Sequence, residues 1–290
     1  MRILNFGSLN IDYVYQVDHF VAAGETLGSF RMDRNTGGKG LNQSVAFAKA
    51  GAEIYHAGCV GRDGDFLVRY LEKTGVHTEY LQVVDVPTGN AIIQVDRQGQ
   101  NCILLYGGAN QAVSHDAVDR VLAAFGEGDL LILQNEISCV DYLITKAHEA
   151  GLSVVLNPSP ISEELLHYPL ELVDWFILNE IEGMALSGEK EPSAIVSAMR
   201  ERFPQARVVL TLGKEGAMYF DSTACVSVPA GKGKPVDTTA AGDTFTGYFF
   251  TGIAVGKTPE EALRWATKAS DITVTRKGAA ESIPYAREIE

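Results

Sequence analysis

Short runs of apolar and β-branched residues alternate along this chain with longer stretches in which apolar residues recur at helical spacing. This alternation constrains the fold most, because it is typical of parallel strands that are covered by helices. The expected core strands lie at residues 3–6, 54–59, 130–133, 154–156, 175–178 and 208–210, and two expected covering helices lie at 65–73 and 117–125. The pattern therefore predicts an α/β fold.

Two segments interrupt this alternation, at about residues 11–36 and 88–108. In the second, AIIQVD and NCILLYGG flank RQGQ, which is the pattern of a β-hairpin. We expect both segments to form one small β appendage on a single domain that spans residues 1–290. No fixed-period repeat or Pro/Ser-rich linker is visible, so we expect one functional site.

The composition argues against several classes of protein. A formal net charge of -13 and a pI near 4.9 would repel a phosphate backbone, so nucleic acid is not an expected partner. The four cysteines are far apart and predict reduced, buried thiols rather than a zinc site. No stretch approaches the ~18 apolar residues of a membrane span, and the first residues turn polar too soon for a secretory signal. No membrane partner and a cytoplasmic location are therefore expected.

A glycine-rich loop, TGGKGLNQ at 36–43, leads into a stretch with helical periodicity. Glycines before a helix let the backbone approach a ligand closely, and a helix N-terminus favours anions and hydroxyl oxygens. The alternative is a tight connection without a ligand. The loop does not match G-x-x-x-x-G-K-[ST], and no G-x-G-x-x-G follows a strand, which disfavours a P-loop NTPase and a dinucleotide-binding dehydrogenase.

A second loop, VDTTAAGDTF at 236–245, carries more information. Ala240, Ala241 and Gly242 leave successive backbone N–H groups bare at the start of a helix, so an anion can bind there. Asp243 then follows directly beside this anion site. The alternative is that Asp243 is only a helix N-cap, a position that Asp fills well.

Taken together, the two loops resemble the two signatures of the ribokinase family of carbohydrate kinases, the PfkB-type kinases. Further matches follow the family's order over nearly the whole chain: GSLNID at 7–12, LQNE at 133–136, LNPSP at 156–160, NEIE at 179–182, TLGKEG at 211–216 and VTRKGAAESIP at 274–284. The resemblance implies a three-layer α/β sandwich with a small β lid, and transfer of the γ-phosphoryl group of ATP to a primary hydroxyl of a small sugar. Ribose is the expected acceptor; fructose, deoxyribose or a nucleoside remain alternatives, as does a catalytically silent sugar-binding regulator.

The same resemblance implies catalytic and sugar-binding residues. Asp243 would be the base that accepts the proton of the sugar hydroxyl, and the amides of Ala240, Ala241 and Gly242 would form the anion hole. The expected sugar contacts are Asn10, Asp12, Gly38, Lys39, Gly40, Asn42, Glu136 and Asp243. Alternatively, Asn10 and Asp12 are turn residues after a strand, and Glu136 caps the next helix.

Nucleotide and ion sites follow by the same resemblance. Asn179 and Glu182 would order the hydration shell of the Mg²⁺ that is bound to ATP. The expected nucleotide contacts are Thr211, Gly213, Gly216, Gly242 and Thr267, although family members often carry a larger polar ring at the last position. A K⁺-type monovalent cation would be held by Asp237, Thr239, Thr273, Arg276, Gly278 and Ser282. The alternative is that Asp237 only caps a turn. A homodimer that forms through the lid is also expected.

Overall fold

The computed structural model describes residues 1–231 and 233–289, and within these residues a nine-stranded sheet forms the centre of the molecule. In spatial order its strands are β13 (Cys225–Val228), β12 (Ala217–Phe220), β11 (Arg207–Thr211), β10 (Trp175–Asn179), β9 (Ser153–Asn157), β8 (Leu130–Gln134), β1 (Ile3–Phe6), β4 (Ile54–Gly61) and β5 (His77–Val84). Neighbouring strands from β5 to β11 are parallel, whereas β12 and β13 are antiparallel additions. The predicted α/β class with a mostly parallel sheet is confirmed.

The six core strands predicted from the sequence are all present, with ends that differ by at most two residues. Three further strands were not predicted. β5 lies at an edge and alternates polar with apolar residues, and β12 and β13 form a hairpin in which Asp221 binds the amides of the turn. Edge strands of this kind lack the continuous apolar run that marks a strand buried on both faces.

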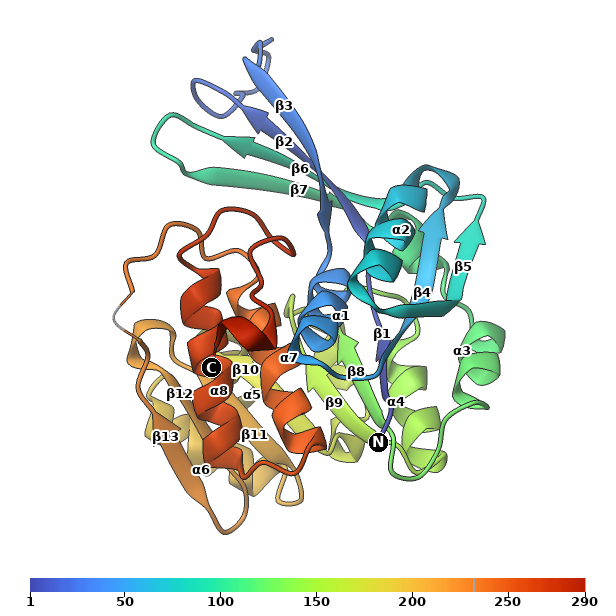
Figure 1. Cartoon of the computed structure of the whole chain (residues 1–290), viewed down its shortest axis with the longest axis vertical. Coiled ribbons are helices and arrows are strands. Elements are labelled where there is room, and N and C mark those ends of the chain that lie inside the picture. Colours follow the sequence, from blue (N-terminus) through green and yellow to red (C-terminus); the bar gives the residue numbers. More distant parts are fainter. Residues whose placement is uncertain (232, 290) are drawn as a thin grey trace.

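Helices cover both faces of the sheet (Figure 1). One face is covered by α1 (Lys39–Ala50), α2 (Asp65–Thr74), α7 (Ala241–Ala254) and α8 (Pro259–Thr273), and the other by α3 (His115–Leu122), α4 (Val140–Glu149), α5 (Glu180–Ser187) and α6 (Pro192–Arg202). Strand side chains alternate between the two resulting cores: Ile3 packs with the first group, Leu4 and Phe6 with the second. The molecule is therefore a three-layer sandwich.

Helix α3 differs from its predicted range of 117–125. It begins earlier because the Ser114 hydroxyl accepts a hydrogen bond from the amide of Ala117 and caps the helix. It ends at Leu122, while Phe125 still packs into the core from the following turn.

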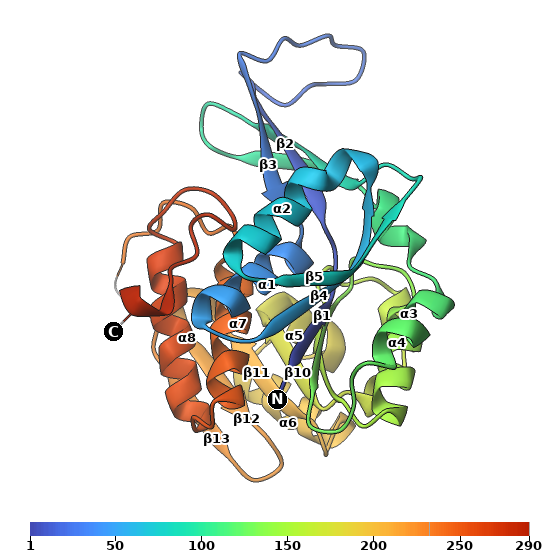
Figure 2. The same cartoon turned by 45° about the vertical axis from the view of Figure 1, so that its right-hand side comes forward.

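A second sheet of four strands lies above one end of the central sheet, where Figures 1 and 2 both show it projecting from the body. Its order is β3 (Arg31–Gly37), β2 (Asn10–Gln16), β6 (Gly89–Val95) and β7 (Asn101–Tyr106). These strands come from the two segments that interrupt the α/β alternation. β6 and β7 form one antiparallel pair, and β2 and β3 form the other. β2 also pairs with β6, in parallel, and so joins the two pairs into one sheet.

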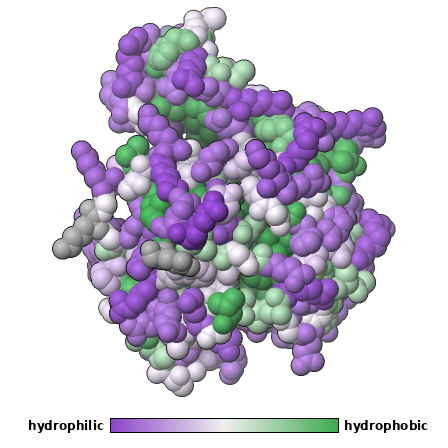
Figure 3. All heavy atoms as spheres, in the orientation of Figure 1, coloured by the Kyte–Doolittle hydropathy of each residue, from purple (hydrophilic) through white to green (hydrophobic). Residues whose placement is uncertain are grey.

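The surface seen in Figure 3 is mostly hydrophilic, and some apolar side chains gather on the second sheet at the top of the view. Exposed apolar residues there are Phe30, Met32, Ile92, Ile103, Leu104, Leu105 and Tyr106. No helix in residues 1–231 and 233–289 is long and apolar enough to cross a membrane.

All four cysteines are free. The prediction that they are buried is confirmed for Cys59, whereas Cys139 is half-buried. The prediction is wrong for Cys102 and Cys225, which are exposed because they lie on the edge strands β7 and β13.

Candidate active site

Polar side chains converge where the parallel strands of the central sheet end. Gln134, Asn157, Asn179 and Thr211 are the last residues of β8, β9, β10 and β11. Helices α1 and α7 direct their N-termini to the same region and lie side by side. Ligands of open α/β sheets bind beyond the carboxyl ends of the strands, so this edge is the candidate site.

The glycine-rich loop packs tightly against the connection between β1 and β2. Gly38 has a φ of 94°, which favours glycine, and a Cβ at Gly40 would collide with the backbone nitrogen of Ser8. Lys39 follows as the first residue of α1, and its amide donates to Glu136 Oε2 at 3.0 Å. The loop therefore needs its glycines for close packing, and that packing holds the start of α1 beside Glu136.

Asp243 is the third residue of α7, not its cap. The N-cap position is Ala240, with a φ of 60°, and no side chain caps the helix. The Asp243 carboxylate instead accepts hydrogen bonds from two side chains of α1: Asn42 Nδ2 donates to Oδ2 at 3.1 Å, and Gln43 Nε2 donates to Oδ1 at 3.0 Å. The alternative of a plain N-cap is therefore wrong, and the buried carboxylate needs another explanation.

Backbone amides lie next to this carboxylate. The amide of Ala241 donates to the carbonyl of Thr238 at 3.3 Å, whereas the amides of Gly242 and Asp243 have no acceptor in the described part of the chain. A Cβ at Gly242 would meet nothing within 4 Å, so its backbone faces open space. Of the three amides that the sequence pattern left bare, that of Ala241 therefore has an acceptor, whereas those of Ala240 and Gly242 have none in the described part of the chain, and an anion can reach the bare amides.

Two adjoining cavities open at these amides. A cavity of about 230 Å³ lies between the N-terminus of α7 and the ends of β9, β10 and β11, and is lined in part by Lys39, Asn179, Glu182 and Asp243. A neighbouring cavity of about 330 Å³ extends along α8 and includes Gly213, Gly216 and Thr267. Thr211, Thr238, Ala241 and Gly242 line both.

Lys39 is a half-buried cation surrounded by carboxylates. Burial works against its charged form, but Asp243, Glu136 and Glu182 together outweigh this effect and raise the pKa of Lys39. Burial also raises the pKa values of Glu136 and Glu182, although Lys39 opposes the change in both. The ammonium group therefore stays charged in the cavity, where it can interact with a negatively charged ligand.

On the side of the second sheet, the expected sugar contacts lie within one group of polar residues. Asn10 Oδ1 accepts from Asn110 Nδ2 at 2.7 Å, and Glu136 accepts from the Ser8 hydroxyl as well as from Lys39. Asn10 and Asp12 belong to β2, and Glu136 does not cap α4, so the turn and cap alternatives for these residues are wrong.

Two groups here are buried or partly buried without a partner in the described residues. Among residues 1–231 and 233–289, none donates a hydrogen bond to the buried Asn42 Oδ1 or to the half-buried Asp12 carboxylate. Burial, with added repulsion from Glu136 and Glu281, raises the pKa of Asp12 to about 7. Buried polar groups are normally hydrogen-bonded, so these oxygens suit a ligand that supplies hydroxyl donors.

Asn179 and Glu182 form a capping box at the start of α5. Asn179 Oδ1 accepts from the amide of Glu182 at 2.9 Å, and Glu182 Oε2 accepts from the amide of Asn179 at 2.9 Å. The cap alone is a sufficient structural reason for these residue types. Both residues also line the smaller cavity, where the oxygens could meet the hydration shell of a hard cation.

The expected nucleotide contacts line the larger cavity, which begins at Thr211. Gly216 has a φ of 108°, and a Cβ there would collide with the carbonyl oxygen of Val228, so β13 requires glycine at this position. Thr267 Oγ1 is buried without a hydrogen-bond partner in the described part of the chain. This orphaned hydroxyl is a polar group that a nucleotide could satisfy.

The expected cation ligands come from the loop before α7 and from the end of α8 with the loop that follows it, and Asp237 joins these two segments. Asp237 Oδ1 accepts from the amide of Thr239 at 2.9 Å and Oδ2 from that of Gly278 at 3.1 Å, so the carboxylate bridges both loops. The remaining expected ligands are the carbonyl oxygens of Thr239, Thr273, Arg276 and Gly278 and the hydroxyl of Ser282. This all-oxygen set with one carboxylate fits a large monovalent cation better than a transition metal.

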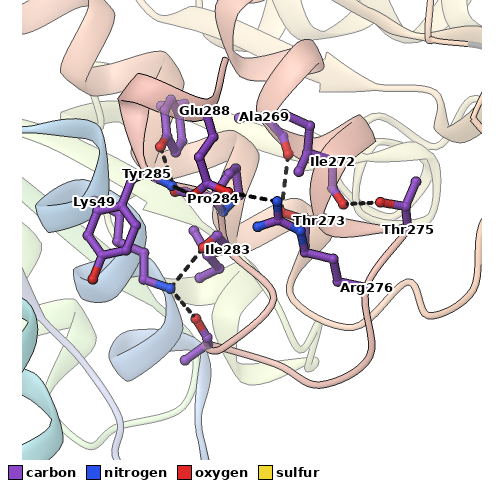
Figure 4. Close-up of polar contacts among 12 residues, drawn as sticks. Lys49, Ala269, Ile272, Thr273, Thr275, Arg276, Ile283, Pro284, Tyr285 and Glu288 are labelled. Atoms are coloured by element: carbon purple, nitrogen blue, oxygen red, sulfur yellow. Dashed lines mark hydrogen bonds and ion pairs between the residues drawn. The ribbon is translucent and has the colours of Figure 1, made fainter. Parts of the chain in front are cut away.

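Figure 4 shows how the C-terminal loop is held. Lys49, at the far end of α1, donates to the carbonyls of Ala280 and Ile283 at 2.9 and 2.8 Å, and Arg276 pairs with Glu288 at 2.7 Å. Burial lowers the pKa of Lys49, although Glu281 and Glu288 oppose this. Helix α1 therefore connects the glycine-rich loop, at one end, to the loop of expected cation ligands at the other.

Several contacts in the site were not predicted as individual residues. Gln43 stands in the quoted loop directly after Asn42, yet only the structure places its amide on Asp243. Ser8, Asn110 and Asn157 support Glu136, Asn10 and Gln43, respectively. Their only signal in the sequence is that Ser8 and Asn157 fall inside matched segments.

Comparisons with known proteins bear on this geometry. Residues 2–286 match the model of the pfkB family of carbohydrate kinases. A ribokinase from Haemophilus influenzae is 36% identical over 295 residues, which cover 97% of this chain and 95% of the relative. A deoxyribokinase from Salmonella typhi is 32% identical over 294 residues, which cover 98% of this chain and 96% of the relative.

Among solved structures, the ribokinase from Arabidopsis thaliana complexed with ribose and ATP has a TM-score of 0.87 and 30% sequence identity. The similarity covers 99% of this chain and 97% of that structure. The likeness therefore extends over both sheets and the whole candidate site.

Proposed function

Because this chain belongs to the pfkB family of carbohydrate kinases, we propose that it transfers the γ-phosphoryl group of ATP to the primary hydroxyl of ribose, giving ribose 5-phosphate. One observation carries the proposal: the Asp243 carboxylate lies between a group of polar residues suited to a polyol and a cavity whose wall holds bare amides and the ammonium group of Lys39. A base, a sugar site and an anion site thus meet at one side chain.

In the proposed reaction Asp243 accepts the hydroxyl proton as the sugar oxygen attacks the γ-phosphorus. The new oxygen–phosphorus bond forms as the bond to the bridging oxygen of ADP breaks. The amides of Gly242 and Asp243, together with Lys39, face the charge that spreads over the transferring group. Most of the catalysis is then alignment and electrostatic stabilisation, as expected for phosphoryl transfer.

The ribose would be bound by Asn10, Asp12, Asn42 and Glu136, with Gly38 and Gly40 allowing close approach of the backbone. The unpartnered oxygens of Asn42 and Asp12 support this assignment because each can accept a hydrogen bond from a sugar hydroxyl. ATP would occupy the two cavities, with its phosphates near Gly242 and its base toward Thr267. Asn179 and Glu182 would contact the water shell of Mg²⁺, which arrives with ATP as part of the substrate.

A monovalent cation such as K⁺ fits the oxygen set around Asp237. When bound, it would supply positive charge close to the anion site. The loop that contains Asp237 and Thr239 leads directly into the amides at the start of α7, so the order of this loop determines how those amides point.

The second sheet would close over the bound sugar as a lid and exclude water, which would otherwise accept the phosphoryl group. We further propose that a second copy of the chain pairs through this sheet. β7 is an edge strand with all six residues exposed, four of them apolar and large, and such edges tend to find partners. A cytoplasmic location, where ATP is available, completes the proposal.

Deoxyribose is the second candidate substrate, because the deoxyribokinase relative is nearly as similar to this chain as the ribokinases. A coupled assay of ADP release with ribose, 2-deoxyribose, fructose and adenosine separates these activities. Ribose should give the highest kcat/KM. Higher turnover with 2-deoxyribose would replace the proposed substrate, and ATP turnover with none of the acceptors would favour the sugar-binding regulator.

A further inference from the structure

Behind the Asp243 carboxylate lies a continuous row of buried polar side chains, which we call the amide chain: Gln43, Gln134, Asn5, Ser44 and His56. Four of them are 0% exposed and Gln134 is 1% exposed. They come from α1, β8, β1 and β4, so the chain runs from the active site between α1 and the face of the sheet that α1 covers. A row of buried polar groups is costly unless its members are satisfied, and in the described residues only Gln134 Oε1 of this row lacks a hydrogen-bond partner.

The hydrogen bonds of the amide chain have one consistent direction. His56 Nε2 lies 3.3 Å from the carbonyl oxygen of Gly7, which can only accept, so Nε2 donates and Nδ1 is an acceptor. The Ser44 hydroxyl then donates to His56 Nδ1 at 2.7 Å. Burial lowers the pKa of His56 to about 4, which keeps this neutral tautomer in place near pH 7.

The same direction continues toward the active site. Asn5 Nδ2 donates to Ser44 Oγ at 2.8 Å and to the Gly40 carbonyl at 2.7 Å, so its Oδ1 must face Gln134. Gln134 Nε2 donates to Asn5 Oδ1 at 2.9 Å and to Gln43 Oε1 at 2.7 Å. Each amide therefore fixes the orientation of the next.

At the end of the chain Gln43 has one acceptable orientation. Its Nε2 donates to Asp243 Oδ1 at 3.0 Å and to Asn157 Oδ1 at 3.3 Å. The orientation of Asn157 is itself set, because its Nδ2 donates to the Ile177 carbonyl at 3.0 Å. If the Gln43 amide turned over, its oxygen would face two acceptor oxygens and its NH₂ would face that of Gln134.

We propose that Gln43 is a positioning residue for phosphoryl transfer: its amide nitrogen holds Asp243 in the orientation that receives the sugar proton, and the remaining members of the amide chain prevent that amide from turning over. Asn42 and Gln43 donate to different oxygens of the carboxylate, so the two bonds together fix its rotation. This inference rests on the proposed role of Asp243 as the base.

The deciding experiment compares Gln43→Met, Gln43→Glu and Asp243→Asn in the ribose kinase assay. Gln43→Met keeps the volume but removes the donor, and we expect kcat to fall by roughly 10- to 100-fold while KM for ribose and ATP changes by less than about threefold. Gln82→Met, on the edge strand β5, is the matched control and should retain the parent kcat.

Gln43→Glu adds a second measurement, the pH dependence of kcat, which should not change if Gln43 had only a structural role. The introduced carboxyl can donate to Asp243 only while protonated, so the ratio of variant to parent kcat should fall by about tenfold or more from pH 6 to pH 9. The ratio for Gln43→Met should stay constant. The charged groups that face Asp243, namely Lys39, Glu136 and Glu182, are the same in both variants.

The outcomes separate this inference from the proposed function. If Asp243→Asn keeps the parent kcat, the base assignment fails. If Asp243→Asn is inactive but Gln43→Met keeps a kcat within about threefold of the parent, Asp243 remains the base and the positioning role of Gln43 is wrong. Equal pH dependence of both Gln43 variants would also overturn it. Should Gln43→Glu not fold, the kcat and KM values of Gln43→Met decide alone.

Discussion

The half-buried charge of Asp12 is expected to destabilise the sugar-free protein, so a neutral residue at this position should raise the free energy of unfolding. Its side chain lies on β2 against the backbone of Gly37, where a Cβ would collide with the carboxyl group. Burial is the main cause that raises its pKa from 3.8 to about 7, and the carboxylates of Glu136 and Glu281 add to it. A sugar hydroxyl that donates a hydrogen bond to the Asp12 carboxylate would offset this free-energy cost, which the sugar-free protein retains in full.

The sign of the pH dependence follows from this shift. Between pH 3.8 and about 7 the folded state holds a proton on Asp12 that the unfolded state has released, so stability falls as pH rises through this window. Above about pH 7 the Asp12 side chain is ionised in both states, and its full destabilising effect on the folded state is present. A shift of about 3 pH units at ~1.4 kcal/mol each sets an upper bound of about 4 kcal/mol, and partial solvation reduces this to about 2 kcal/mol.

The test is urea unfolding of Asp12→Asn and the parent without sugar, at pH 8.5 and pH 5.5. Asparagine removes the charge at almost the same volume. We expect the variant to be more stable by about 1–3 kcal/mol at pH 8.5, with an advantage that is smaller by about 1 kcal/mol or more at pH 5.5. Saturating ribose should stabilise the parent much more than the variant.

Asp85→Asn is the matched control, because Asp85 and its partner Arg62 are both more than 80% exposed. Its effect should stay within about 0.5 kcal/mol at both pH values. Equal or lower stability of Asp12→Asn at pH 8.5, or an advantage that does not change with pH, would refute the reasoning.

Two further predictions concern the cation and the assembly. Turnover should be higher in potassium than in sodium or tetramethylammonium salts at equal ionic strength, and Asp237→Ala should lose this preference; identical rates in all three salts would rule out a functional cation site. In sedimentation at micromolar concentration with ribose present, the parent should be a dimer and Leu104→Asp, which places a charge on the exposed face of β7, should be a monomer. A parent that sediments as a monomer would contradict the proposed pairing.

The sequence predicted the central sheet well because its parallel strands are buried on both faces and appear as short apolar runs, such as those at β1 and β10. The strands at the edges of the sheet were harder to predict from the sequence. In β5 exposed polar residues interrupt the apolar ones, and β12 and β13 depend on a turn held by Asp221. Local patterns of this kind do not distinguish a strand from a loop.

For the site, the two loops located Asp243 and the glycines, but not the side chains that hold the carboxylate. The contact of Gln43 with Asp243 joins residues 200 positions apart in the sequence, and depends on the packing of α1 against α7. The alternative of a helix cap at Asp243 is excluded only by the structure, because the helix begins at Ala241. Glu136 is a similar case, since the residues that it contacts precede it by about a hundred positions.

Transfer of phosphate to ribose by the parent and by Asp243→Asn, measured as ribose 5-phosphate formed from ATP, is the most direct test of the central claim. We expect the parent to be active, and the variant to fold with the same circular dichroism spectrum but to be slower by roughly 10²- to 10⁴-fold, the usual contribution of a positioned base. Near-parental ribose 5-phosphate formation by the folded variant would contradict the assignment of Asp243 as the catalytic base.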